Sequence, residues 1–115
     1  MRKRNGKTSG PTVEWMVDHI RGYLARDCTL DDFYQPIPGL LKLYRPYYES
    51  GKDVAYLPAY FWENAWVLCN EVFLGSRTER TLRTFLKAWL KNLELGQEAW
   101  QARVERGEEP WKAAV

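Results

Sequence analysis

The sequence has little of what metal enzymes and small secreted domains depend on. Its 115 residues include one histidine, His19, and two cysteines, Cys28 and Cys69. A single histidine excludes metal sites that need two, and a small secreted scaffold usually carries more cysteines than this chain. Cys69 lies in a strongly apolar segment, where a thiol is typically inert. We therefore expect free thiols and a cytoplasmic protein.

Long apolar runs and glycine-rich loops are also missing. No stretch approaches the ~20 apolar residues of a membrane span, so we expect no membrane partner. The cationic residues 1–7 resemble the start of a signal peptide, but the polar segment after them is not the apolar region that such a peptide requires. No P-loop or dinucleotide-binding glycine pattern occurs. The best carboxylate pair, Asp31 and Asp32, would diverge on a helix. We expect no enzyme activity, no cofactor and no bound metal.

The composition is that of a globular domain. Hydrophobic residues make up 45% of the chain, charged residues 28% and aromatic residues 15%, with six tryptophans. This balance differs from that of disordered chains, and the length suits one domain. Residues 1–10 lack an apolar side chain after Met1. We expect a flexible basic tail over residues 1–10 and a single helical domain over residues 11–115.

Apolar spacing predicts helices and no confident strand. Three- and four-residue steps indicate helices at 12–26, 58–74 and from Ser76 to near Gly96, with shorter helical segments at 30–34, 40–44 and 97–106. The short segments and prolines favour an all-α fold, a compact irregular bundle of four to five helices. The same spacing predicts a shared core for four tryptophans: Trp15, Trp62, Trp66 and Trp89.

Capping side chains predict where two of the helices begin. Thr29 and Asp32 form a predicted capping box before the segment at 30–34, and Ser76 and Glu79 form another before the basic helix. Pro46 is expected to end or kink the helix at 40–44, because proline cannot continue a helical hydrogen-bond pattern.

A near-neutral net charge of +2 conceals two basic regions. Residues 76–92 carry five cations and one acid, whereas residues 11–75 carry five cations and nine acids. At about 100° per residue, the five cations project within one sector, opposite the apolar residues of the helix. They are expected to face outward, and they are Arg77, Arg80, Arg83, Lys87 and Lys91.

A row of cations on one helix face suits a phosphate backbone, because each neutralised phosphate releases counterions. Solvated surface is the competing interpretation, since outward charges are normal on an amphipathic helix. A merely solvated face would usually interleave glutamate with lysine. The tail repeats the positive sign and predicts a flexible arm along nucleic acid. Its cations are Arg2, Lys3, Arg4 and Lys7.

An aromatic cluster offers a different function. Tyr44, Arg45, Tyr47 and Tyr48 lie at a proline break, where exposed tyrosine and arginine suit a protein interface or can stack on nucleic-acid bases. Rings that merely cover the end of the bundle are the alternative.

We therefore predict a non-enzymatic protein that binds DNA or RNA through the phosphate backbone, as a small subunit of a nucleoprotein complex. The runner-up is a protein–protein interaction module that binds other subunits or itself through exposed aromatic residues.

Overall fold

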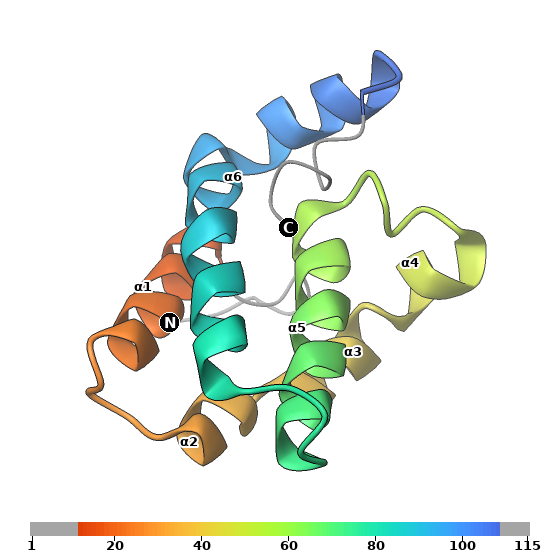
Figure 1. The fold of residues 1–115 in the computed structure, drawn as a ribbon. Helices are drawn as coiled ribbons and strands as arrows, with labels where there is room; N and C mark the ends of the chain where they lie inside the picture. The colour runs from red at the N-terminus through yellow and green to blue at the C-terminus, as the bar shows by residue number, and fades with distance from the viewer. Residues whose placement is uncertain (1–11, 109–115) are drawn as a thin grey trace, which may run out of the picture.

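Residues 12–108 are the part of the chain that the computed structural model describes, and all of its regular elements are helices (Figure 1). They are α1 (Val13–Leu24), α2 (Leu30–Tyr34), α3 (Ile37–Leu43), α4 (Arg45–Ser50), α5 (Leu57–Phe73) and α6 (Glu79–Glu105). No strand occurs within this range, so the predicted all-α bundle is confirmed. Three segments of five to seven residues turn the chain between the longer helices, which makes the bundle irregular.

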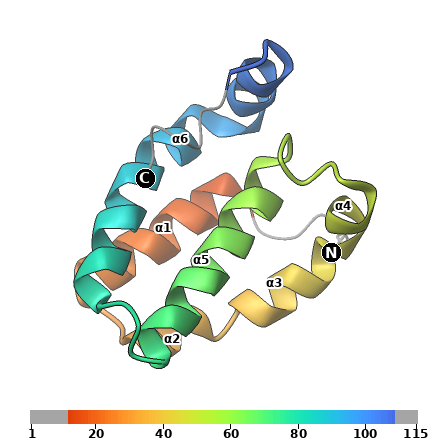
Figure 2. The ribbon, with the colours of Figure 1, turned by 45° about the vertical axis from the view of Figure 1, so that its right-hand side comes forward.

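Helix α6 packs against both α1 and α5 and so joins the two sides of the bundle (Figure 2). The buried side chains of these helices and of α2 and α3 form one hydrophobic cluster. The division into a tail and a domain stays a prediction, because residues 1–11 lie outside the described range. Among the described residues, no helix has both the length and the apolar character to span a membrane.

The helices in the first half of the chain begin and end largely where local sequence signals predict. The Thr12 hydroxyl accepts a hydrogen bond from the Trp15 amide at 3.1 Å and caps α1. The predicted capping box before α2 is confirmed, since Thr29 and Asp32 each accept a hydrogen bond from the other's amide at 3.2 Å. The chain also breaks near Pro46, which lies in the first turn of α4.

Helix α6 begins later than predicted, and the proposed capping box of Ser76 and Glu79 is wrong. Thr78 is the N-cap, because its extended backbone lets its hydroxyl accept from the Thr81 amide at 3.2 Å. The Ser76 hydroxyl donates instead to the Glu71 carbonyl. The Glu79 carboxylate is free to accept a hydrogen bond from the hydroxyl of Tyr23 on α1.

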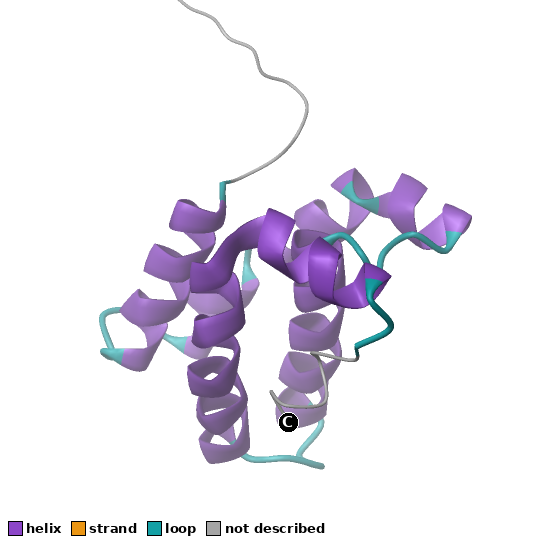
Figure 3. Cartoon of the chain, turned by 90° about the horizontal axis from the view of Figure 1, so that it is seen from above, coloured by secondary structure: helices purple, strands orange, loops and turns teal. Residues whose placement is uncertain are grey.

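Gly96 divides α6 into two parts that run in different directions (Figure 3). Its φ of 91° and ψ of 171° belong to a region that is essentially restricted to glycine. The second part lies against the start of α5. There the Gln97 side chain accepts from the Leu57 amide at 2.7 Å, and Trp100 donates to the Val54 carbonyl at 2.7 Å. The predicted break near Gly96 is therefore a kink that directs side chains onto α5.

Two of the four tryptophans expected in the core lie outside it. Trp62 and Trp89 are buried, as predicted, and Trp100 joins them. Trp15 is 38% exposed and stacks on His19 with ring centroids 4.7 Å apart, at the edge of the bundle. Trp66 is 37% exposed, because α5 is covered by neighbouring helices on only part of its circumference. The apolar spacing identified these residues, but it overestimated how much of each helix is covered.

Candidate functional site

A straight row of polar side chains follows the outer surface of α6. Arg80, Thr84, Lys87 and Lys91 are all exposed and follow four- and three-residue steps, which keep them on one line. The opposite side of the helix carries the buried residues Leu82, Leu86, Trp89 and Leu93. We call the four exposed residues the α6 stripe. Its amphipathic register is the one that the sequence predicts.

The three cations of the α6 stripe carry uncompensated charge. Within residues 12–108, none of Arg80, Lys87 and Lys91 forms an ion pair, whereas five other arginines do. These three cations are exposed, and no carboxylate of the described range lies within ion-pair distance of them. An exposed cation of this kind is available to bind an anion from outside the protein.

Arg77 lies near the α6 stripe, but it is already engaged with α5. Its Nε lies 2.8 Å from the Glu71 carboxylate, and the side chain is 52% exposed. Because Arg77 precedes the helix, this ion pair connects the last turn of α5 to the start of α6. About half of the Arg77 side chain still faces solvent.

Arg83 does not face outward, and the expectation that it does is wrong. Its side chain is only 16% exposed and turns toward α1. The guanidinium lies 4.2 Å from the centroid of the Tyr23 ring and donates to the Tyr23 carbonyl at 3.1 Å. Glu79 approaches its other nitrogen at 3.6 Å. Arg83 therefore joins α6 to the end of α1.

Arg26 is a cation at this surface that the sequence did not indicate. It follows α1 with a positive φ of 66° and lines a hollow of about 430 Å³ together with Glu79, Arg80 and Arg83. The sequence placed Arg26 at the end of a helix, far along the chain from the basic segment. No local pattern could indicate that the packing of α1 on α6 brings these residues together.

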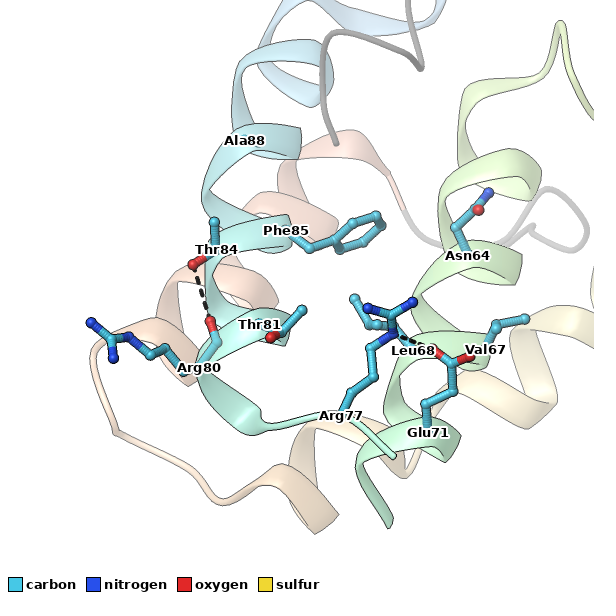
Figure 4. A pocket seen from close by; sticks show the side chains of 10 residues that line it. All are labelled: Asn64, Val67, Leu68, Glu71, Arg77, Arg80, Thr81, Thr84, Phe85 and Ala88. Carbon is cyan, nitrogen blue, oxygen red and sulfur yellow. Dashed lines mark hydrogen bonds and ion pairs between the residues drawn. The ribbon is translucent and has the colours of Figure 1, made fainter. Parts of the chain in front are cut away.

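A groove of about 710 Å³ lies on the other side of the α6 stripe, between α5 and α6 (Figure 4). Its apolar residues are Val67 and Leu68 of α5 and Phe85 and Ala88 of α6. Its polar residues gather mostly toward the start of α6, and they are Asn64, Glu71, Arg77, Arg80, Thr81 and Thr84. Arg80 lines both the groove and the hollow, so it stands on the ridge between them.

The tyrosine cluster covers the end of the bundle that lies away from the α6 stripe. Tyr44 is buried, and Tyr47 stacks on Tyr56 with ring centroids 4.1 Å apart. Tyr48 is half-buried, and its hydroxyl donates to the Ala59 carbonyl at 2.7 Å. Of the four predicted interface candidates, only Arg45 is exposed, because Tyr44 is buried and Tyr47 and Tyr48 are half-buried.

The two cysteines and the histidine lie in the core or pack at its edge. Burial raises the pKa of the Cys69 thiol to about 12. The pKa of the half-buried Cys28 thiol is also raised, mainly by burial and secondly by the nearby carboxylates of Asp32 and Asp27. The His19 ring lies between Trp15 and Phe33, with a ring nitrogen 2.9 Å from the Phe33 carbonyl oxygen. Residues 12–108 contain no group of ligands suited to a metal ion.

The predicted basic arm falls outside the described residues, so its position relative to α6 stays a prediction. Its members are Arg2, Lys3, Arg4 and Lys7.

No family model, no curated protein and no solved structure matches this chain. The α6 stripe and its surroundings are therefore the features of this chain that indicate a function.

Proposed function

We propose that this chain binds nucleic acid through the phosphate backbone, with the α6 stripe as the contact surface. The observation that carries the proposal is the line of three exposed cations without ion-pair partners among residues 12–108. Lysine and arginine at such positions release counterions when they neutralise phosphates. Binding of this kind positions a protein on nucleic acid and carries little sequence information.

The dimensions and surroundings of the stripe suit this role. From Arg80 to Lys91 it runs about 16 Å at about 1.5 Å per residue, which matches about five base steps of a duplex at about 3.4 Å each. Arg26 and Arg77 extend the positive surface to either side of Arg80. The acidic residues 11–75 would keep most of the remaining surface away from phosphates.

Charge reversal of the stripe tests the proposal. The triple variant Arg80→Glu, Lys87→Glu, Lys91→Glu should weaken binding to labelled oligonucleotides by tenfold or more in fluorescence anisotropy. It should also reduce the steepness of the log–log salt dependence by about 2.7 on duplex DNA, at about 0.9 per phosphate contact. Arg83 is left unchanged because it contacts Tyr23.

The matched control reverses three exposed cations elsewhere: Lys42→Glu, Arg45→Glu, Lys52→Glu. Both triple variants change the net charge by the same amount, so a smaller effect of the control would locate binding on α6. Equal losses would mean that overall charge governs binding. A wild-type protein without salt-sensitive binding to any strand or duplex would overturn the proposal.

The N-terminal arm has its own test. Deletion of residues 1–7 removes four cations and should lower the salt dependence without abolishing binding. A complete loss of binding would transfer the proposed contact surface from α6 to the arm.

Exposed apolar residues on α5 favour a second candidate function, self-association. Trp66 and Phe73 lie seven residues apart on one line of the helix, and Val67 and Leu74 lie on the next. Leu74 is 83% exposed, and a contiguous apolar patch often marks an interface. Sedimentation velocity discriminates the two functions: a monomer at micromolar concentrations that binds oligonucleotides supports the first, and a dimer without binding supports the second.

A further inference from the structure

The groove between α5 and α6 opens directly beside the α6 stripe. Arg80 and Thr84 belong to both features, so a strand that follows the stripe would pass along the edge of the groove. The groove volume of about 710 Å³ is within the range of about 300–1,000 Å³ that is typical of ligand pockets. A space of this kind is not needed to bind a phosphate backbone alone.

One side of the groove offers an aromatic ring in a set orientation. The Phe85 side chain projects from α6 toward α5 (Figure 4) and packs on Phe61 and Trp89, with ring centroids 6.2 and 5.9 Å away. Leu68 and Val67 lie across the groove from it. Such a surface accepts a flat apolar group against the ring, because every nucleic-acid base has a face that stacks on aromatic side chains.

The groove also presents both types of hydrogen-bonding group. The Asn64 amide nitrogen donates to the Tyr60 carbonyl at 2.8 Å, which leaves its oxygen as an acceptor. The half-exposed Arg77 side chain supplies guanidinium donors. Base edges carry both donors and acceptors, so they match this mixed lining.

We infer that this groove holds an unstacked base, and that the chain consequently binds single-stranded nucleic acid in preference to a duplex. In a duplex each base is stacked and paired, and only its groove edges are accessible. In a single strand the bases can turn out and stack on aromatic side chains. The inference deepens the proposed function and rests on it: phosphates on the α6 stripe place a neighbouring base at the groove beside Phe85.

The experiment compares strands that carry accessible bases with probes that do not. Anisotropy titrations use oligothymidylate, oligouridylate, a duplex, and an abasic strand with the same number of phosphates. Wild-type protein should bind at least one base-carrying strand about 5- to 150-fold more tightly than the abasic strand, the range that one base–aromatic stack of about 1–3 kcal/mol provides. The affinity for the duplex should be close to the affinity for the abasic strand when the two probes carry equal numbers of phosphates.

Two variants address the groove itself. Ala88→Leu fills it with an aliphatic side chain, and Phe85→Leu removes the ring but keeps an apolar contact with the core. Both should reduce the preference for base-carrying strands to less than twofold. The control Ala102→Leu makes the same change at another half-buried alanine of α6, away from the groove, and should keep the full preference.

The outcomes separate this inference from the proposed function. If wild-type protein binds abasic strands and duplexes as tightly as base-carrying strands, the groove holds no base, although binding through the α6 stripe stands. If both groove variants keep the preference, or Ala102→Leu loses it equally, the groove is not where the base binds. If no probe binds, both proposals are overturned together.

Discussion

Arg80 and Arg83 lie three residues apart on α6, yet their surroundings assign them different tasks. Arg80 projects into solvent on the ridge between groove and hollow, whereas Arg83 lies over the Tyr23 ring with its side chain 16% exposed. A hydrogen bond from a charged donor contributes about 1.5–3 kcal/mol and a cation–π contact about 0.5–1 kcal/mol at exposed sites. The exposed Glu79 carboxylate adds little, because solvent screens such pairs.

Arg83→Gln should therefore lower the free energy of unfolding by about 1–3 kcal/mol. Arg80→Gln is the matched control and should change it by no more than about 0.5 kcal/mol, as exposed substitutions usually do. Urea unfolding followed by circular dichroism measures both. Equal effects would contradict the structural role assigned to Arg83.

Two tyrosine hydroxyls provide a second residue-scale comparison. The buried Tyr44 hydroxyl has no hydrogen-bond partner within the described range, whereas the Tyr48 hydroxyl donates to the Ala59 carbonyl. Tyr44→Phe should leave stability unchanged or raise it by about 1 kcal/mol, since it removes an unsatisfied buried group. Tyr48→Phe should lower it by about 0.5–1.5 kcal/mol. Thermal unfolding tests the order; a larger loss for Tyr44→Phe would mean that its hydroxyl is bonded.

At the scale of elements, the kink in α6 brings a side chain that caps the start of α5. Helix α5 has no side-chain cap of its own, and the Leu57 amide would lack a partner without the Gln97 side chain. The same glutamine donates to the Ala55 carbonyl at 2.9 Å. Because Gly96 changes the direction of α6, residues that follow it reach the loop before α5.

Gly96→Ala should lower the free energy of unfolding by about 1–3 kcal/mol, the usual cost of a strained backbone conformation. No atom would clash with the added methyl group, so the loss would arise from φ alone. Gly39→Ala on α3 is the control, also without a clash, and should stabilise by about 0.5–1 kcal/mol because alanine favours helices. Guanidinium unfolding distinguishes the two, and a neutral Gly96→Ala would contradict the kink.

At the scale of the whole molecule, tyrosine burial predicts how stability depends on alkaline pH. Burial is the main cause that raises the pKa of Tyr23, Tyr44 and Tyr48 above the ordinary tyrosine value. For Tyr23, the Glu79 carboxylate adds to the shift. The folded protein thus holds these protons more tightly than the unfolded chain does.

The free energy of unfolding should therefore stay nearly constant with respect to these groups up to about pH 9 and fall above about pH 10, where tyrosines of the unfolded chain ionise. Chemical denaturation at a series of pH values measures this loss, and tyrosinate absorbance measures ionisation. The absorbance of the buried tyrosines should rise together with unfolding. Full ionisation near pH 10 in a protein that remains folded would contradict their burial.

The sequence by itself determined the features that depend on neighbours along the chain. The outward positions of Arg80, Lys87 and Lys91 follow from residue spacing and helix geometry, and the Thr29–Asp32 capping box and the break at Gly96 follow from residues a few positions apart. The all-α class followed in the same way from apolar periodicity. These signals are local, so one sequence was sufficient to find them.

Only the tertiary structure decided which side chains meet across helices. It turned Arg83 toward Tyr23, brought Arg26 beside Arg80, left Trp15 and Trp66 half-covered, and opened the groove at Phe85. It also directed the Glu79 carboxylate to the Tyr23 hydroxyl of α1. Each outcome depends on how α1, α5 and α6 pack, and the spacing of residues along one helix contains no information about the position of another.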